Sequence, residues 1–134
     1  MNIESYQDLL QAAAAQAEPQ RLLFVFAKAE LPNGYTDSQK QQFEQGHGGA
    51  LEPVLCVDKL PEEISEFQQL VTESQTTGID WDIAFVSALG GRGGFPPNSD
   101  EAVQPLKMMM QKIQGGMIAD FLTFDKNGEL VALY

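Results

Sequence analysis

An uninterrupted run of six apolar residues, Leu22 to Ala27, constrains the fold of this chain more than any other sequence feature. A strand with one solvated face would alternate apolar and polar side chains, so an unbroken run predicts a strand buried on both faces. Such strands are typical of parallel sheets that helices cover on both sides. Two further apolar runs, Val54 to Val57 and Trp81 to Leu89, predict strands of the same kind.

Helical patterns separate these runs. Apolar residues recur at helical spacing from Tyr6 to Ala17, behind a capping pair formed by Ser5 and Asp8. Comparable patterns and capping signals predict three more helices, at 36–45, 61–78 and from Ser99 or Asp100 to 115. In the last of these, Pro105 is expected within the first turn. We expect buried faces on the last two helices, formed by Ile64, Phe67, Leu70, Val71 and Ser74, and by Val103, Leu106, Met109, Met110 and Ile113.

The C-terminal segment predicts a hairpin. Two apolar stretches, 117–125 and 129–133, flank the dipeptide Asn127-Gly128, which favours a tight turn between antiparallel strands. The complete order is α-β-α-β-α-β-α-β-β. It predicts one α/β domain over residues 1–134, with a mixed, mainly parallel five-stranded sheet flanked by helices and ending in this hairpin.

Composition places the chain among ordinary globular proteins. A chain of 134 residues with 43% hydrophobic content can bury a core without disulfides. No apolar run approaches the roughly 20 residues of a transmembrane helix, and the first residues lack the basic and apolar segments of a signal peptide. Because Cys56 is the only cysteine, no intrachain disulfide can form, and we expect a cytoplasmic protein that does not bind membranes.

The net charge of −11 narrows the range of partners. A nucleic-acid-binding protein would need a basic surface, which this composition disfavours. Solubility is the ordinary explanation of this charge. The alternative is a basic protein partner, drawn in by the electrostatic field.

The segment Gly90 to Gly94 is the most prominent candidate binding site. Four glycines surround Arg92, so the backbone can expose N–H groups beside one fixed positive charge. It follows a predicted strand and precedes a predicted helix, where an anion such as phosphate or carboxylate is favoured. The segment matches neither the dinucleotide fingerprint nor the P-loop, because Pro96 stands where the former needs glycine. A mobile loop or a loop that contacts a partner is the alternative.

Sets of catalytic side chains are sparse, so we predict no catalytic residues, metal site or cofactor. Cys56 lies within an apolar run, where burial would keep its thiol inert, and a Cys56–His47 pair is a minor alternative. Ser87 lacks the flanking glycines of a nucleophile elbow. Asp58 and Glu30 each follow a predicted strand and are the residues that a Mg²⁺-dependent enzyme would use, although solvated acids explain them as well.

Two features point to protein contacts. A helix cannot bury three successive side chains on one stripe, so Met108 in the run Met108-Met109-Met110 is expected to point partly outward unless a neighbouring element covers it. The edge strand at 129–133, with Tyr134 behind it, offers a homodimer contact through strand pairing.

Four stretches of the sequence, 19–26, 48–51, 56–59 and 91–94, resemble those of a family of short bacterial proteins of about this length. Members of that family are frequently labelled "ribonucleotide reductase subunit alpha". The resemblance covers nearly the whole chain and implies no catalytic residues. The label implies a thiyl-forming cysteine plus a redox-active cysteine pair, which Cys56 alone cannot supply. We therefore expect the label not to describe the chemistry of this chain.

The sequence thus favours a binding or protein-interaction module over an enzyme. The alternative is a protein that binds a small anion, or an enzyme that uses the loop at Gly90 to Gly94.

Overall fold

The apolar run lies at the centre of strand β1, which occupies the middle of the sheet. The computed structural model of the chain describes residues 3, 5–30, 50–115, 117–118 and 121–131. Its elements are, in chain order, α1 (Tyr6–Ala14), β1 (Gln20–Glu30), β2 (Ala50–Lys59), the 3₁₀ turn η1 (Pro61–Glu63), α3 (Phe67–Gln75), β3 (Ile83–Gly90), α4 (Ser99–Gln114) and β4 (Leu122–Phe124). The helix predicted at 36–45 lies outside the described residues.

The sheet is antiparallel, so the predicted parallel five-stranded sheet is wrong. Four strands pair in the order β2-β1-β3-β4. β1 is antiparallel to both neighbours, with Phe24 opposite Val57 of β2 and Val86 of β3. β4 is antiparallel to β3.

The alternation of strands and helices misled the prediction because it does not state which strands are neighbours. β2 and β3 both run opposite to β1 and are therefore parallel to each other, joined through η1 and α3. They do not pair, because β1 lies between them. The crossover expected of a β-α-β unit therefore connects β2 to β3. Because β1 lies between these two strands and runs opposite to both, each of them pairs with β1 in the antiparallel direction.

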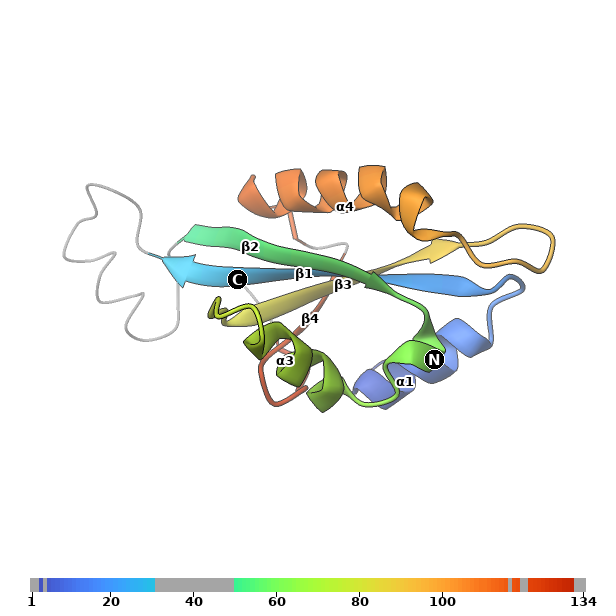
Figure 1. Cartoon of the computed structure of the whole chain (residues 1–134), viewed down its shortest axis with the longest axis horizontal. Coiled ribbons are helices and arrows are strands. Elements are labelled where there is room, and N and C mark those ends of the chain that lie inside the picture. Colours follow the sequence, from blue (N-terminus) through green and yellow to red (C-terminus); the bar gives the residue numbers. More distant parts are fainter. Residues whose placement is uncertain (1–2, 4, 31–49, 116, 119–120, 132–134) are drawn as a thin grey trace.

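Both faces of β1 are buried because helices cover both faces of the sheet. Leu22, Phe24 and Phe26 point to the face that carries α1 and α3, whereas Leu23, Val25 and Ala27 point to the face that carries α4. Figure 1 shows α4 on one side of the sheet and α1 and α3 on the other. The prediction of a doubly buried strand is confirmed, although its direction relative to its neighbours is not.

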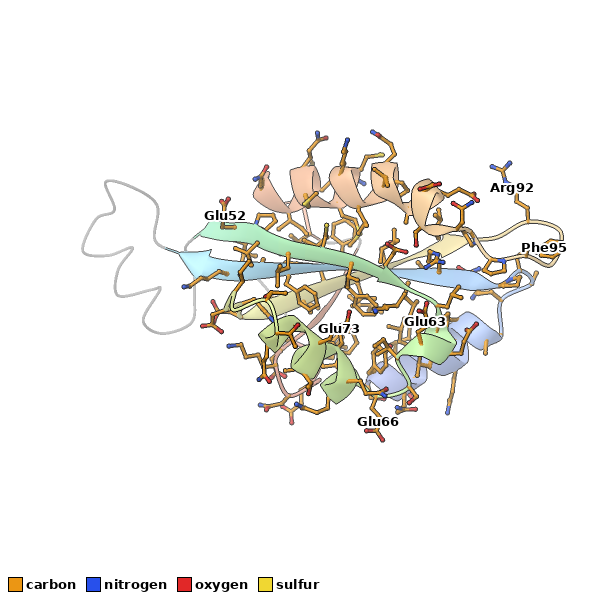
Figure 2. All side chains as sticks on the ribbon, in the orientation of Figure 1. Glu52, Glu63, Glu66, Glu73, Arg92 and Phe95 are labelled. Atoms are coloured by element: carbon orange, nitrogen blue, oxygen red, sulfur yellow. The ribbon has the colours of Figure 1, made fainter. Side chains whose placement is uncertain are left out.

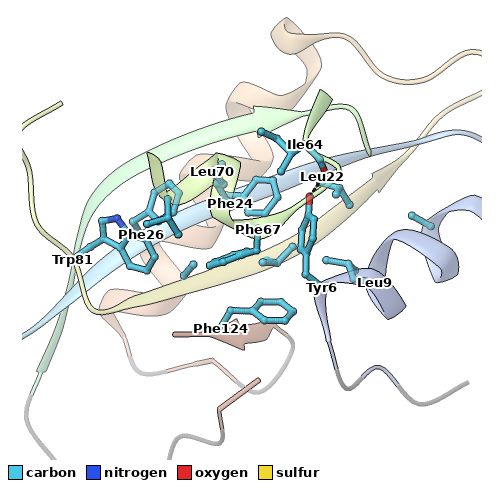
Figure 3. Close-up of a cluster of buried hydrophobic side chains, with 14 residues drawn as sticks. Tyr6, Leu9, Leu22, Phe24, Phe26, Ile64, Phe67, Leu70, Trp81 and Phe124 are labelled. Atoms are coloured by element: carbon cyan, nitrogen blue, oxygen red, sulfur yellow. Dashed lines mark hydrogen bonds between the residues drawn. The ribbon is translucent and has the colours of Figure 1, made fainter. Parts of the chain in front are cut away.

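Tyr6 of α1 connects the elements on the first face (Figure 3). Its ring lies 5.7 Å from the ring of Phe67 in α3 and 6.3 Å from that of Phe124 in β4. Its hydroxyl donates a 2.8 Å hydrogen bond to the carbonyl oxygen of Ile64, between η1 and α3. Burial raises the pKa of the Tyr6 phenol above its ordinary value.

Local signals identified the start of α1 correctly, but not that of α3. Ser5 Oγ accepts a hydrogen bond from the backbone N–H of Asp8, as predicted for the start of α1. The five predicted inward residues at 64–74 are all buried, although Pro61 begins a 3₁₀ turn and α3 starts only at Phe67.

The predictions for α4 need three corrections. Asn98, rather than Ser99 or Asp100, caps the helix, and its side chain accepts from the N–H of Glu101. Pro105 lies beyond the first turn. Ala102 takes the buried position expected of Val103, which is 50% exposed.

The C-terminal hairpin forms around the predicted turn, but its first strand is only β4, Leu122–Phe124, and not the whole stretch 117–125. Gly128 has φ +78°, and the N–H of Asp125 donates to the carbonyl of Glu129. Beyond the turn, the N–H of Val131 donates to the carbonyl of Thr123, and single bridges join Leu130 to Phe124 and Glu129 to Ser5, so residues 129–131 pair through isolated bridges and not as a regular strand. Residues 132–134, including Tyr134, lie outside the described residues.

Within the described ranges, no helix combines the length and the apolar character that crossing a membrane requires.

Replacing Tyr6 with phenylalanine tests the hydrogen bond to Ile64. The substitution leaves a buried carbonyl without its donor, so we expect the free energy of unfolding at pH 7 to fall by about 1–2 kcal/mol.

The phenol also links stability to pH. Its folded-state pKa is raised, so its contribution is complete below about pH 10, the value in the unfolded chain. Above that pH, the contribution falls by about 1.4 kcal/mol per pH unit.

Denaturant titrations of the wild type and of Tyr6→Phe from pH 8 to pH 11 measure both effects. Lysines and other tyrosines titrate in both proteins, so the difference between the two curves isolates Tyr6. A difference that stays constant across pH 10 would show that the phenol titrates normally in the folded protein.

Candidate functional site

The glycine-rich segment forms a tight turn at the end of β3. The N–H of Arg92 donates to the carbonyl of Phe95 and the N–H of Phe95 donates to that of Arg92, each over 3.0 Å. Gly93 and Gly94, between them, have φ of +60° and +86°. Positive φ at both central residues is the requirement of a type I′ hairpin turn, which glycine meets without strain.

Two contacts with the chain between α1 and β1 brace this turn. The N–H of Gly91 donates to the carbonyl of Pro19 over 2.9 Å, and the N–H of Gly94 donates to Oε2 of Glu18 over 2.8 Å. A side chain at Gly91 would overlap the carbonyl oxygen of Phe95, so only glycine fits there. The turn is therefore held at its base and near its tip.

The braced turn presents Arg92 and Phe95 to solvent. Phe95 is 74% exposed, the highest value among the large apolar residues that the structure describes. Figure 2 shows both side chains at the end of the molecule opposite Glu52. An exposed aromatic ring on a braced turn is a feature of contact surfaces, because aromatic and arginine side chains supply most binding energy at protein interfaces.

A polar cluster fastens the chain that follows the turn. Nη1 of Arg21 donates to Oδ2 of Asp58 over 2.8 Å, and Nε of Arg21 donates to the carbonyl of Pro97 over 2.7 Å. The Ser99 hydroxyl donates to the same Asp58 oxygen over 2.7 Å. The Arg21 and Asp58 side chains are only 11% and 18% exposed. The cluster ties the start of α4 to β1 and β2.

A groove of about 500 Å³ lies beside the turn, between the C-terminal end of α1 and η1. Alanine and proline residues, including Ala14, Ala17, Pro61 and Pro96, form much of its lining, together with the longer side chains of Gln16, Gln20 and Leu60. Its charged lining residues are Glu18 and Glu62, and neither forms an ion pair within the described part of the chain. The turn and this groove form the candidate site.

The structure places Gly90, Gly91, Arg92, Gly93 and Gly94 together, but protein atoms already accept from several of their N–H groups. Pro19, Phe95 and Glu18 accept from Gly91, Arg92 and Gly94, respectively. The start of α4 is also engaged by its Asn98 cap and carries Asp100 and Glu101 in its first turn. An anion at the turn would therefore have to displace the Glu18 carboxylate and lie close to acidic side chains. The predicted anion site remains a prediction.

The predicted burial of Cys56 is wrong, because its side chain is exposed. An apolar run indicates cover on both faces, but β2 is an edge strand and Cys56 is one of its uncovered positions. His47, its hypothetical partner, lies outside the described residues.

The antiparallel sheet separates Asp58 from Glu30. Asp58 pairs with Leu23, whereas Glu30 pairs with Ala50. The seven-residue step along β1 from Leu23 to Glu30 spans roughly 23 Å, so Asp58 and Glu30 lie toward opposite ends of the sheet and are too far apart to share one Mg²⁺. Among the described residues, no group of three or more His, Cys, Asp or Glu side chains is placed to hold a metal ion.

The features predicted to support a homodimer are dispersed. Met108 is 50% exposed, as the helical spacing predicted. Val103, equally exposed, lies on the opposite flank of α4, so the two do not form one apolar stripe.

The sheet edges offer little for strand pairing between two chains. At the predicted edge, Ser5 already pairs with Glu129. At the other edge, β2 carries Pro53 and a register shift opposite Phe26 and Ala27, which discourage pairing with another chain.

Sequence reasoning missed Phe95 and Glu18. Phe95 follows the glycines directly, and a two-residue Gly-Gly turn flanked by Arg92 and Phe95 was a readable hairpin signal. Nothing in the sequence indicated that Glu18 would reach the turn, because this contact spans 76 residues.

Comparisons with known proteins add no further constraint: the chain matches no family model, no curated protein and no solved structure.

Removing the Asp58 carboxylate tests the cluster beneath the turn. Asp58→Ala leaves the guanidinium of Arg21 shielded from water without its partner, so we expect a loss of about 2–3 kcal/mol in the free energy of unfolding. Ser99→Ala should cost about 1 kcal/mol. The matched control is Glu73→Ala, which breaks the more exposed Lys59–Glu73 pair and should cost less than about 1 kcal/mol. The free energies of unfolding are measured by urea denaturation. Equal losses for Asp58→Ala and Glu73→Ala would show that Asp58 does not stabilise the fold through its cluster with Arg21 and Ser99.

Proposed function

We propose that this protein is a protein-interaction module and that the turn from Arg92 to Phe95 is its main contact. The single observation that carries the proposal is the exposure of Phe95 at the tip of a turn held by hydrogen bonds to Pro19 and Glu18. Transferring an exposed phenylalanine ring from water into a partner's pocket is worth about 1.5–3 kcal/mol.

Pre-organisation of the turn supports the same proposal. A contact residue on a mobile loop loses conformational entropy on binding, which weakens the complex. The bonds at Gly91 and Gly94 fix the backbone around Phe95 before any partner arrives. Arg92 flanks the ring and supplies a donor for hydrogen bonds at the rim of the contact.

The net charge of −11 supports a basic protein partner, because opposite charges accelerate association at moderate ionic strength. The same charge disfavours nucleic acid. We place the protein in the cytoplasm on the strength of its single, exposed cysteine. The resemblance to short bacterial proteins accords with this setting.

Substituting Phe95 tests the contact. In Phe95→Ala the fold should be unchanged, with a free energy of unfolding within about 0.5 kcal/mol of the wild type, because the ring is largely exposed. Binding should weaken by about tenfold or more, as for a residue at the centre of an interface. The measurement is quantitative mass spectrometry of proteins that co-purify with the tagged protein from its native cells.

Val103→Ala is the matched control, since it removes an exposed apolar side chain from α4. Gly91→Ala tests presentation: the added carbon displaces the turn without altering Phe95 itself, so the same co-purifying proteins should be lost. Retention of every specific partner by Phe95→Ala, or equal losses in Val103→Ala, would contradict the proposal.

A small anion bound at the turn is the second candidate function. The observation in its favour is that the Glu18 carboxylate already accepts from the N–H of Gly94, which supports an oxyanion of a ligand taking the same position beside Arg92. A bound phosphate or carboxylate would stabilise the folded chain. We expect phosphate to raise the melting temperature of the wild type and not that of Arg92→Ala; an equal response of both proteins would eliminate this candidate.

A further inference from the structure

We infer that the groove between α1 and η1 binds a short basic segment of the partner chain, with lysine or arginine side chains beside small apolar ones. This inference rests on the proposed function, because the groove shares the end of the molecule with Phe95. It names the chemistry of the partner, which the exposed ring alone does not.

The size and walls of the groove fit a short peptide. Its volume of about 500 Å³ lies within the range of ligand sites in proteins. Pro19, Pro61 and Pro96 line it, and proline has a fixed backbone angle and no N–H group. Ala14 and Ala17 keep the floor shallow. Such walls are pre-formed and offer apolar contact without demanding a particular side-chain shape.

The charge of the groove selects the partner. The side chains that line it include two carboxylates, Glu18 and Glu62, and no lysine or arginine. Within the described part of the chain, the Glu18 carboxylate accepts one hydrogen bond, from the N–H of Gly94, and a carboxylate offers about four acceptor positions. An ammonium or guanidinium group placed between the two carboxylates would complement them, whereas an acidic segment would be repelled.

The position of the groove links it to the turn. Pro96, one of its walls, directly follows Phe95, and Glu18, another, holds Gly94. A partner that covers the Phe95 ring is therefore next to the groove and can contact both. On the partner, an apolar pocket would take the Phe95 ring, and a basic segment next to that pocket would bind in the groove.

Fluorescence anisotropy with two labelled octapeptides tests the inference. The first carries three lysines separated by alanine and leucine, and the second has glutamate at each lysine position. We expect the lysine peptide to bind and the glutamate peptide not to bind. The variant Glu18→Gln/Glu62→Gln should weaken binding of the lysine peptide about fivefold, the size expected for two exposed charge pairs.

Two variants separate the groove from the general charge of the protein. Glu52→Gln/Glu129→Gln removes the same number of charges elsewhere and should bind as the wild type does. Ala17→Trp fills the groove from an exposed position and should abolish binding while circular dichroism stays unchanged. Equal weakening in the two glutamine variants, unchanged binding by Ala17→Trp, or no binding of the lysine peptide to the wild type would overturn the inference.

The same peptides distinguish this inference from the proposed function. Suppose that the lysine peptide binds, that Ala17→Trp abolishes this binding, and that Phe95→Ala retains all partners. This result would support the groove as a binding site and contradict the turn as the main contact. Loss of partners in Phe95→Ala without any peptide binding would retain the turn and remove the basic segment.

Discussion

The burial of β1 on both faces is the constraint on which the rest of the structure depends. Its side chains enter two separate apolar clusters, one beneath α1 and α3 and one beneath α4. Its backbone pairs with β2 on one side and β3 on the other. Every layer therefore meets at this strand. The neighbouring strands pair with the edges of β1 and leave its two faces open, so helices must cover each face. In this arrangement α1, η1 and the glycine turn lie at one end of the sheet.

Much of this architecture was predictable from the sequence because it follows from local patterns. The unbroken apolar run identified the doubly buried strand, Ser5 and Asp8 identified the start of α1, and helical spacing identified the buried residues of α3. Strand direction was not predictable in this way. Burial reports how much of a strand is covered, not which way its neighbours run, so a central antiparallel strand between helical layers has the same sequence signature as a parallel one.

The candidate site was predictable only in part. The glycines located the turn correctly at the end of β3, but the contacts that give it shape come from Pro19 and Glu18, more than 70 positions earlier in the chain. The exposure of Cys56 was hidden for a related reason, since the position of β2 at the sheet edge depends on strand order. Asp58 was noticed for its carboxylate, yet its role follows from Arg21 and Ser99, which it holds together across three elements.

The placement of β1 between β2 and β3 also bears on synthesis of the chain. Of the four described strands, β1 is the first to leave the ribosome, and β2 and β3, its two partners, are completed only at Lys59 and Gly90. Until then, its apolar side chains and at least one row of backbone hydrogen-bonding groups remain uncovered. Such segments invite association with other chains. During synthesis, therefore, the strand that becomes the centre of the folded sheet is exposed and prone to associate with other chains.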